Sequence, residues 1–305
     1  MNSYSGFCAL CDEIKCEYSV DMPLRDYTSF KIGGNADVIV FPDTAEKLVS
    51  VTEYANNNSI RMLIIGKGSN LLINDNGFRG IVVNTCKMDK IVSLDDTTIY
   101  CECGASLSRL CRFALDKSLT GLEFAFGIPG TAGGAAYMNA GAYGGEMKDV
   151  LVSCAHISSD GKIGKFSGEE LDLAYRHSVY SDRDYIILSL TLELKKGDKA
   201  EIKAKMDDLM SRRKDKQPLE YPSAGSTFKR PEGYFAGALI EQCGLKGYAS
   251  GGAQVSEKHA GFVINKGGAT AEDVMKVINH CKKTVLEQTG VELEPEVKII
   301  GQEGI

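Results

Sequence analysis

Residues 127–145, GIPGTAGGAAYMNAGAYGG, place the strongest constraint on the fold of this chain. The nineteen positions hold seven glycines and five alanines, and no charged residue. Glycine has no Cβ, so the backbone here can approach a ligand or another stretch of backbone closely at many points. Pro129 and Asn139 leave too little apolar length for a membrane helix. One structural turn does not need seven glycines, so a ligand held against the backbone is favoured over simple close packing.

A second glycine-rich stretch, GKGSNLLIND at residues 66–75, directly follows the apolar run RMLII. This order predicts a tight turn at the end of a strand. Successive backbone N–H groups in such a turn form a concavity that binds anions such as phosphate. Leu71 replaces the third glycine of the Rossmann fingerprint, and no P-loop pattern occurs. A plain chain-reversing turn is the alternative, but two such stretches together suggest a dinucleotide held in another way.

Hydrophobic periodicity indicates a mixed α+β chain. Apolar runs at residues 37–42, 61–66 and 80–84 predict strands. Apolar residues at helical spacing follow the first run, and they predict a helix that begins at Asp43 or Thr44. Further helices are predicted at 106–119, 200–220 and 270–290, and further strands in the runs KIVSLD, TIYCECG, DYIILSLTLEL and VELEPEVKIIG. The last of these strands covers residues 291–301.

The composition narrows the possible partners. The chain has 305 residues, 43% of them hydrophobic, which is enough for two or three domains with real cores. A net charge of -6 argues against general attraction to nucleic acid. No signal-peptide pattern and no uninterrupted apolar run of membrane length occurs, so we expect a cytoplasmic protein without membrane attachment. Pro218 and Pro222 mark a boundary before the last part of the chain.

The cysteines and histidines do not predict a metal site. Ten cysteines are scattered along the chain, and we expect them to be reduced thiols. Cys8, Cys11 and Cys16 offer CxxC spacing but lack the second pair of ligands that structural zinc sites usually have. The four histidines form no metal-ligand spacing. We therefore expect no metal.

Motifs along nearly the whole chain resemble those of a known family. YTSFKIGGNADVIVFP, IIGKGSNLLINDNGFRGIVV and GLEFAFGIPGTAGGAAYMNAGAYGGE occur in that order in FAD-binding domains of the vanillyl-alcohol oxidase type. With YRHSVY, SAGSTFKRP, GGAQVSEKHAGFVIN and LEPEVKIIG, the chain resembles the UDP-N-acetylenolpyruvoylglucosamine reductase family from about residue 22 to residue 301. No long insertion with a substrate-capping tyrosine follows YRHSVY, so the resemblance is to the shorter class of the family.

The resemblance implies a fold and a reaction. The fold is α+β, with FAD-binding lobes at residues 1–87 and 88–212 and a C-terminal α+β substrate-binding domain at 213–305 that carries a catalytic strand. The implied reaction, in peptidoglycan precursor synthesis, is the reduction of UDP-N-acetylglucosamine enolpyruvate to UDP-N-acetylmuramate. NADPH is the implied reductant, and FAD is the cofactor. Neither glycine-rich stretch contains a histidine, so we expect noncovalent FAD.

The resemblance also implies the residues that hold the flavin. They lie in or beside the two glycine-rich stretches. The expected contacts are Gly66, Lys67, Gly68, Ser69, Asn70, Leu71, Gly127, Ile128, Pro129, Gly130, Thr131, Gly133, Gly134, Asn139 and Gly141.

Three residues are the expected catalytic groups. Arg176, in YRHSVY, has a planar fork suited to the substrate carboxylate, although a surface role is the commoner fate of an arginine. Ser226, after Gly225, is by resemblance the proton donor; the plain interpretation is a turn residue. Glu296 is by motif the catalytic acid, whereas acids on a strand face normally mean a solvated edge. Tyr180 stands where the family motif has phenylalanine.

Lys229, Arg230, Gln254 and His259 are the expected contacts for a small nucleotide-sugar substrate, and no obligate protein partner is evident. Two alternatives stay open at this point. One is another flavin oxidase or dehydrogenase of the same FAD-binding fold. The other is a nucleotide sensor without catalysis.

Overall fold

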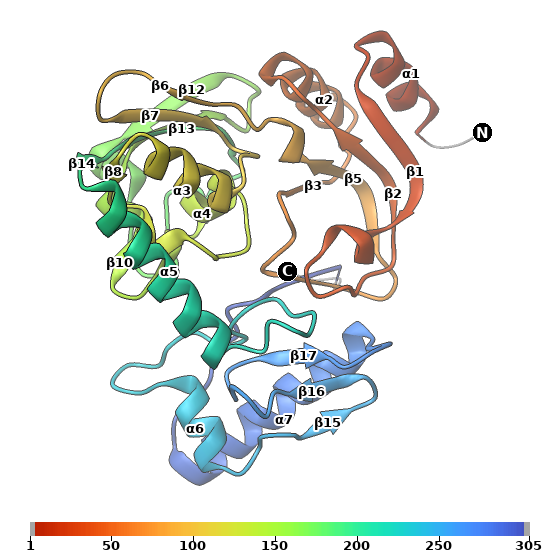
Figure 1. Cartoon of the computed structure of the whole chain (residues 1–305). Coiled ribbons are helices and arrows are strands. Elements are labelled where there is room, and N and C mark those ends of the chain that lie inside the picture. The colour runs from red at the N-terminus through yellow and green to blue at the C-terminus, as the bar shows by residue number, and fades with distance from the viewer. Residues whose placement is uncertain (1–3, 302–305) are drawn as a thin grey trace. The chain divides into compact units, whose positions relative to one another are not determined.

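Residues 4–301 are described by a computed structural model (Figure 1). The chain divides into two compact units. Unit 1 contains residues 1–19, 38–67 and 80–212, and unit 2 contains residues 20–37, 68–79 and 213–305. Each unit therefore combines segments that are far apart in the sequence. The three-part division at 87 and 212 stays a prediction.

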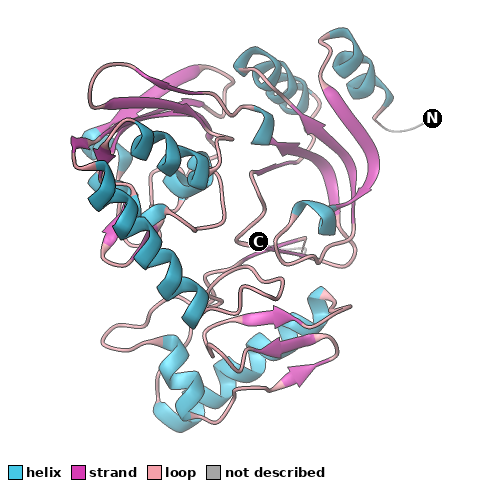
Figure 2. Ribbon diagram, in the orientation of Figure 1, coloured by secondary structure: helices cyan, strands magenta, loops and turns pink. Residues whose placement is uncertain are grey.

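Helices and strands are interspersed along the chain (Figure 2), which confirms the predicted α+β class. The α-helices are α1 (Ser5–Glu13), α2 (Ala45–Asn57), α3 (Leu107–Asp116), α4 (Ala132–Tyr137), α5 (Lys199–Lys216), α6 (Ala236–Gln242) and α7 (Ala271–Thr289). Short 3-10 helices are η1 (Leu24–Tyr27), η2 (Thr85–Lys87), η3 (Glu123–Ala125), η4 (Met147–Asp149) and η5 (Gly168–Leu171). The strands of the larger sheets are β1 (Glu17–Pro23), β2 (Asn35–Phe41), β3 (Met62–Ile65), β5 (Phe78–Asn84), β6 (Ile91–Ser93), β7 (Thr98–Glu102), β11 (Leu151–Ile157), β12 (Ile163–Ser167), β13 (Ile186–Glu193), β15 (Ala249–Ser250), β16 (Ala253–Val255) and β17 (Val263–Asn265). The remaining strands form two-stranded pairs: β4 (Leu71–Ile73), β8 (Leu119–Thr120), β9 (Gly141–Ala142), β10 (Gly145–Glu146), β14 (Lys195–Lys196) and β18 (Lys298–Ile300).

Unit 1 is built on a five-stranded sheet of order β12-β11-β13-β7-β6. Its neighbouring strands pair antiparallel throughout. Cys101, Cys154 and Leu190 stand in register across the three central strands and are all buried. Helix α4 packs on β13 and β7, and α3 packs beside it. Because α4 is part of the second glycine-rich stretch, that stretch packs on this sheet.

A smaller sheet has the order β1-β2-β5-β3, with β3 parallel to β5. Helix α2 connects β2 to β3. Thr44 is the N-cap of α2, and its hydroxyl oxygen accepts a hydrogen bond from the Lys47 N–H. The helix buries Leu48 and Val51. Both the helix and its predicted start are confirmed.

Unit 2 contains an antiparallel sheet of order β15-β16-β17, on which α7 packs. Thr270 and Asp273 form a reciprocal capping box at the start of α7. Gly290 ends the helix with φ +72°, the left-handed conformation that favours glycine. The apolar face of α7, which includes Val274 and Val277, is buried against the sheet. The predicted helix at 270–290 is confirmed.

The predicted strand at residues 291–301 is wrong in extent, because only β18 forms, at Lys298–Ile300, and it pairs with β4 alone. Pro295 has no N–H to donate to a ladder. It pairs with Phe228 in an isolated antiparallel bridge. Leu293 and Val297 are nevertheless buried.

The second glycine-rich stretch is also more ordered than a loop. It contains helix α4 and the two short strands β9 and β10. Helix formation at Ala132–Tyr137 follows from the Thr131 N-cap and the three alanines of the segment AGGAAY.

Candidate active site

The first glycine-rich stretch forms the turn between β3 and β4. A Cβ atom on Gly66 would clash with the Thr131 side chain, so this turn and the second stretch are in contact inside unit 1. Gly68 has φ +57°, and a Cβ atom there would clash with the Tyr27 carbonyl oxygen. Close approach therefore requires glycine at both positions.

Three successive backbone N–H groups in this turn, those of Lys67, Gly68 and Ser69, have no acceptor within residues 4–301. Gly68 is nevertheless buried, whereas Lys67 is exposed and Ser69 is half-buried. A buried N–H group without an acceptor costs about 1–3 kcal/mol, so the Gly68 N–H points to an acceptor that a ligand supplies. Consecutive N–H groups of this kind bind phosphate oxygens. The turn therefore fits a cofactor that contains a diphosphate, such as FAD.

The second stretch is fixed by backbone hydrogen bonds at the start of α4. The N–H groups of Ala132 and Gly133 donate to the carbonyl oxygens of Ala105 (2.7 Å) and Cys103 (2.8 Å). A Cβ atom on Gly133 would lie 2.7 Å from Cys103 Cβ. Close internal packing, the alternative from the sequence, thus accounts for Gly133. The flavin contacts expected from residues 127–134 stay a prediction.

Asn139 and Gly141 lie beyond α4 in tightly bonded positions. Asn139 Nδ2 donates to Glu146 Oε2 and to the Ala174 carbonyl oxygen, both at 2.9 Å, and Oδ1 accepts from the Lys148 N–H at 2.8 Å. Gly141 pairs with Glu146 in the β9–β10 hairpin. Both donor hydrogens of the Asn139 amide thus have acceptors within the protein, and its predicted flavin contact stays a prediction.

Arg176 is presented by a two-residue turn in unit 1. The N–H and C=O groups of Ala174 and His177 bond to each other at 3.1 and 3.2 Å and close the turn. Arg176 occupies its third position with φ +55°. Type II turns place a positive φ there and normally take glycine or asparagine. An arginine in this conformation is strained, and such strain tends to be kept where the side chain has a function.

Side-chain hydrogen bonds anchor the chain after this turn. Ser178 Oγ donates to the Tyr137 carbonyl oxygen at 2.6 Å. Tyr180 Oη lies 3.1 Å from His156 Nδ1 and donates to the Cys154 carbonyl oxygen at 3.3 Å. Burial, with a smaller contribution from the Arg183 charge, lowers the pKa of His156, so the ring is neutral. The tyrosine that replaces the motif's phenylalanine therefore has partners for its hydroxyl group.

In unit 2, the structure brings the segment that contains Ser226 beside the segment that contains Glu296. The Glu296 N–H donates to the Thr227 carbonyl oxygen at 2.8 Å, and the Lys229 N–H donates to the Glu294 carbonyl oxygen at 2.8 Å. Ser226 is half-buried, and its hydroxyl group donates to the Phe228 carbonyl oxygen over 3.3 Å. This long bond holds the serine proton weakly.

Asn70 joins this pair of segments from the first glycine-rich stretch. Its Nδ2 atom donates to the Glu296 carbonyl oxygen at 3.2 Å, and its own carbonyl oxygen accepts from the Lys298 N–H at 2.9 Å. A predicted cofactor residue and a predicted catalytic residue therefore meet within unit 2.

The two cationic side chains that are expected to bind the substrate, Lys229 and Arg230, have partners in unit 2. Lys229 Nζ lies 2.5 Å from Glu294 Oε1 in a half-exposed ion pair. The Arg230 guanidinium lies over the Phe235 ring at 4.0 Å, and its Nε donates to the Tyr234 carbonyl oxygen. Both side chains are accessible to an anionic ligand, so their substrate roles stay predictions.

Gln254 and His259 have local partners as well. Gln254 Nε2 donates to the Gly247 carbonyl oxygen at 3.1 Å. His259 Nδ1 accepts the Gly261 N–H at 3.1 Å, which leaves the proton of the neutral ring on Nε2. Burial lowers the pKa of His259, which favours that neutral form. A neutral Nε2–H group can donate a hydrogen bond to a ligand oxygen.

Sequence reasoning missed the structural bonds of the two asparagines and the pairing of His156 with Tyr180. The sequence offers one signal for the asparagines, because each is a side-chain amide within a glycine-rich stretch. Their acceptors are 35 and 226 residues away and have no sequence signature.

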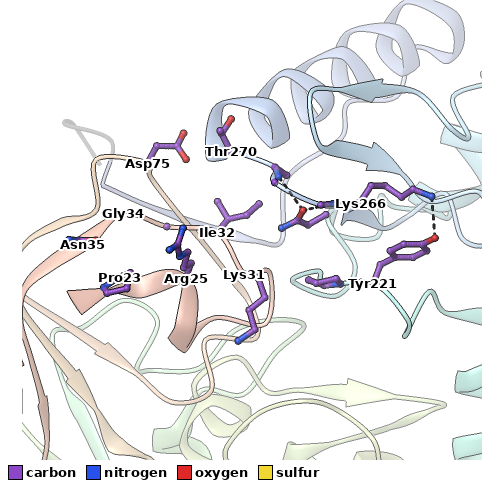
Figure 3. A pocket seen from close by; sticks show the side chains of 16 residues that line it. Pro23, Arg25, Lys31, Ile32, Gly34, Asn35, Asp75, Tyr221, Lys266 and Thr270 are labelled. Carbon is purple, nitrogen blue, oxygen red and sulfur yellow. Dashed lines mark hydrogen bonds between the residues drawn. The ribbon is translucent and has the colours of Figure 1, made fainter. Parts of the chain in front are cut away.

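Unit 2 also contains a pocket of about 710 Å³, which is lined by none of the predicted site residues (Figure 3). Arg25, Lys31 and Lys266 give it a positive lining. Lys266 Nζ donates to Tyr221 Oη at 3.1 Å. The Asp75 carboxylate accepts the first two N–H groups of α7, from Ala271 and Glu272. Several of the charged groups in this pocket thus already have structural roles.

Across residues 4–301, no three side chains of His, Cys, Asp or Glu gather as a metal site. The ten cysteines are free thiols. Burial raises the pKa of Cys103 to about 12, so its thiol stays protonated at neutral pH. Within the same range, none of the helices combines the length and apolar character needed to cross a membrane.

Comparison with known proteins identifies the family. Residues 36–167 match the family model described as FAD binding domain, and residues 217–300 match the one described as UDP-N-acetylenolpyruvoylglucosamine reductase, C-terminal domain. The chain is 52% identical over 289 residues to the UDP-N-acetylenolpyruvoylglucosamine reductase of Clostridium novyi, covering 95% of this chain and 94% of that protein. The chain belongs to the UDP-N-acetylenolpyruvoylglucosamine reductase family.

Two further relatives of this reductase family agree. The reductase of Listeria innocua is 51% identical over 283 residues, which cover 92% of this chain and 94% of that protein. The crystal structure of the Thermus caldophilus reductase is similar with a TM-score of 0.79 and 33% identity, covering 93% of this chain and 98% of that one. The predicted family is therefore confirmed, and the predicted fold, an FAD-binding domain followed by a reductase C-terminal domain, is confirmed with it.

Proposed function

We propose that this chain uses NADPH and FAD to reduce UDP-N-acetylglucosamine enolpyruvate to UDP-N-acetylmuramate, in the cytoplasm, as a step of peptidoglycan precursor synthesis. The observation that carries the proposal is the 52% identity to a curated reductase along 94% of its length. The match of residues 217–300 to the reductase C-terminal domain separates this function from that of a general flavin oxidase. The chain is accordingly an FAD-dependent oxidoreductase that acts on a nucleotide sugar.

The two glycine-rich stretches support noncovalent binding of FAD. The N–H groups of Lys67, Gly68 and Ser69 are the groups that would donate hydrogen bonds to the diphosphate oxygens. Thr131 contacts Gly66 within unit 1, so the second stretch meets the start of this turn. FAD, when bound, supplies the hydride carrier between NADPH and the enolpyruvyl double bond.

The remaining chemistry needs a cation and an acid from the chain. When the methylene carbon of the enolpyruvyl group gains a hydride, an electron pair is left on the adjacent carbon, next to the carboxylate. Arg176 would stabilise the resulting enolate through its guanidinium group. Ser226 would give its hydroxyl proton to that carbon, which completes the two-electron reduction of the double bond.

Glu296 and Lys229 support the serine in this proposal. The Glu296 N–H bonds to Thr227, the residue after Ser226, so the two segments keep one arrangement. A protonated Glu296 side chain can hydrogen-bond the enolate oxygen, as an acid with a raised pKa does in other enzymes. Lys229 lies three residues after Ser226 and supplies positive charge for the alkoxide left by proton transfer.

Substitution of Ser226 tests the proposal. Ser226→Ala should leave the protein yellow and leave flavin reduction by NADPH at the wild-type rate. Oxidation of the reduced flavin by the substrate should slow by about 10²–10⁴-fold, the usual contribution of a positioned acid. Stopped-flow absorbance at the flavin band measures the two steps separately. Ser223→Ala, in the same segment, is the matched control and should behave as wild type.

Three results would count against the proposal. Wild-type protein whose NADPH oxidation ignores UDP-N-acetylglucosamine enolpyruvate would point to another flavoenzyme of this fold. Colourless protein that is indifferent to FAD would point to a nucleotide sensor. A fully active Ser226→Ala variant would remove the serine from its role and leave the rest intact.

A further inference from the structure

Asn139 is a fully buried amide whose hydrogen-bonding capacity is almost entirely used. Its side chain has 0% exposure. Both Nδ2 hydrogens have acceptors at 2.9 Å, the Glu146 carboxylate and the Ala174 carbonyl oxygen, and Oδ1 accepts the Lys148 N–H. An amide has two donor hydrogens, so no donor is left for a ligand.

The orientation of this amide follows from its partners. A flipped amide would place Oδ1 against two acceptors and the NH₂ group against a donor, so the amide has only one workable orientation. Asn139 also has φ +42°, a left-handed conformation that asparagine adopts more readily than most residues. Both the side chain and the backbone conformation therefore favour asparagine here.

The acceptor of interest is the Ala174 carbonyl oxygen, because Ala174 opens the turn that presents Arg176. The same oxygen accepts the His177 N–H at 3.1 Å, the bond that closes the turn. On the far side of the turn, Ser178 Oγ donates to the Tyr137 carbonyl oxygen at 2.6 Å. Tyr137, the last residue of α4, and Asn139, two residues later, thus hold the arginine turn from both sides.

We propose that Asn139 is a positioning residue, which fixes the turn at Ala174 and thereby sets the direction of the Arg176 guanidinium group. The inference rests on the proposed function, in which Arg176 binds the substrate carboxylate. It assigns the Asn139 side chain to the arginine turn rather than to FAD. The last part of the second glycine-rich stretch then serves the substrate, while its first part serves the cofactor.

Asn139→Gly is the main test, because glycine keeps the positive φ and removes only the amide. Hydrogen exchange of residues 175–178, followed by mass spectrometry, should become faster. The kcat/KM for UDP-N-acetylglucosamine enolpyruvate should fall about tenfold, the rate equivalent of about 1.4 kcal/mol. FAD affinity and the rate of flavin reduction by NADPH should stay at wild-type values.

Asn139→Asp is the second variant and nearly preserves the shape of the side chain. It keeps the acceptor for Lys148 but turns an oxygen toward Ala174 and Glu146. Its effects on exchange and on kcat/KM should be at least as large as those of the glycine variant. If Asn139→Gly does not fold, this variant carries the test.

A double-mutant cycle with Arg176→Ala separates positioning from general structural damage. If Asn139 acts through Arg176, then Asn139→Gly should lower kcat/KM by less than about twofold once Arg176 is gone, because coupled residues are non-additive. Tyr180→Phe is the matched control: it removes a buried hydroxyl bond from the same segment, but not the contact to Ala174. It should lower stability without changing exchange at 175–178 or kcat/KM.

Equal effects of Asn139→Gly with and without Arg176 would overturn the inference, and so would unchanged exchange at residues 175–178. A loss of FAD affinity in Asn139→Gly would mean that the Asn139 side chain contributes to cofactor binding. If wild-type protein shows no substrate-dependent NADPH oxidation, the proposed function fails. The exchange experiment would still decide whether Asn139 holds the turn.

Discussion

The two glycine-rich stretches share one arrangement but differ in how firmly they fix it. Each contains an asparagine whose Nδ2 donates to a carbonyl oxygen in the segment of a predicted catalytic residue: Asn70 to Glu296 at 3.2 Å, and Asn139 to Ala174 at 2.9 Å. Asn139 is fully buried and makes three hydrogen bonds. Asn70 is half-exposed, and its side chain makes a single bond within residues 4–301.

This difference separates the roles of the two asparagines. A buried amide with both donors used can serve only the protein. Asn70 has one N–H and its Oδ1 still available for a ligand. We therefore expect Asn139 to affect the substrate step alone, and Asn70 to affect both cofactor and substrate.

Substitution of the proposed catalytic residues should give the largest effects. These substitutions test whether the segments that the two asparagines contact belong to an active site. Arg176→Ala removes a cation from developing negative charge, a loss typically worth about 10²–10³ in kcat. Glu296→Gln should suppress substrate turnover by a similar factor, about 10²-fold. Flavin absorbance of the purified variants should equal that of wild type. Wild-type turnover in either variant would remove that residue from the site.

Asn70→Ala should have a moderate effect and should show that the two asparagines differ in role. We expect kcat/KM to fall about tenfold or less, because one bond to the Glu296 backbone is lost. Unlike Asn139→Gly, it should also weaken FAD binding, which can be measured by titration of the deflavinated protein with FAD. An unchanged FAD affinity in Asn70→Ala would mean that both asparagines serve the protein alone.

The helices and the family could be predicted from the sequence. The signals for helices are local, and the family motifs follow one another in a recognisable order. Residues 48 and 51 recur at helical spacing, and Thr44 and Thr270 are N-caps of the ordinary kind. The motif order from the glycine-rich stretches to the reductase C-terminal pattern identified the family without any structural information. The helix signals depend on neighbours within a few residues, and the family signal depends on the order of short motifs.

Other features could not be predicted, because they depend on contacts across long separations. Gly133 and Gly134 give no local signal for a helix, yet both lie in α4, where Gly133 packs against Cys103, thirty positions earlier. The pattern at 291–301 predicts a strand, but Leu293 and Val297 are buried there outside any strand. The sequence pattern predicts which residues are buried, but it does not show whether the segment pairs with another strand.

The smallest expected effect concerns the backbone of the arginine turn, which the amide of Asn139 holds in place. Arg176 has φ +55°, which costs a residue with a Cβ atom about 1 kcal/mol or more relative to glycine. Glycine loses about 0.4–1 kcal/mol of this advantage through the greater freedom of its unfolded chain. Arg176→Gly should therefore be slightly more stable than Arg176→Ala, by about 0.5 kcal/mol in urea unfolding. At Tyr175, whose φ is not positive, the same pair should rank in the opposite order. Alanine equal to or better than glycine at both positions would show that the turn relaxes in solution, and the firm hold assigned to Asn139 would then be lost.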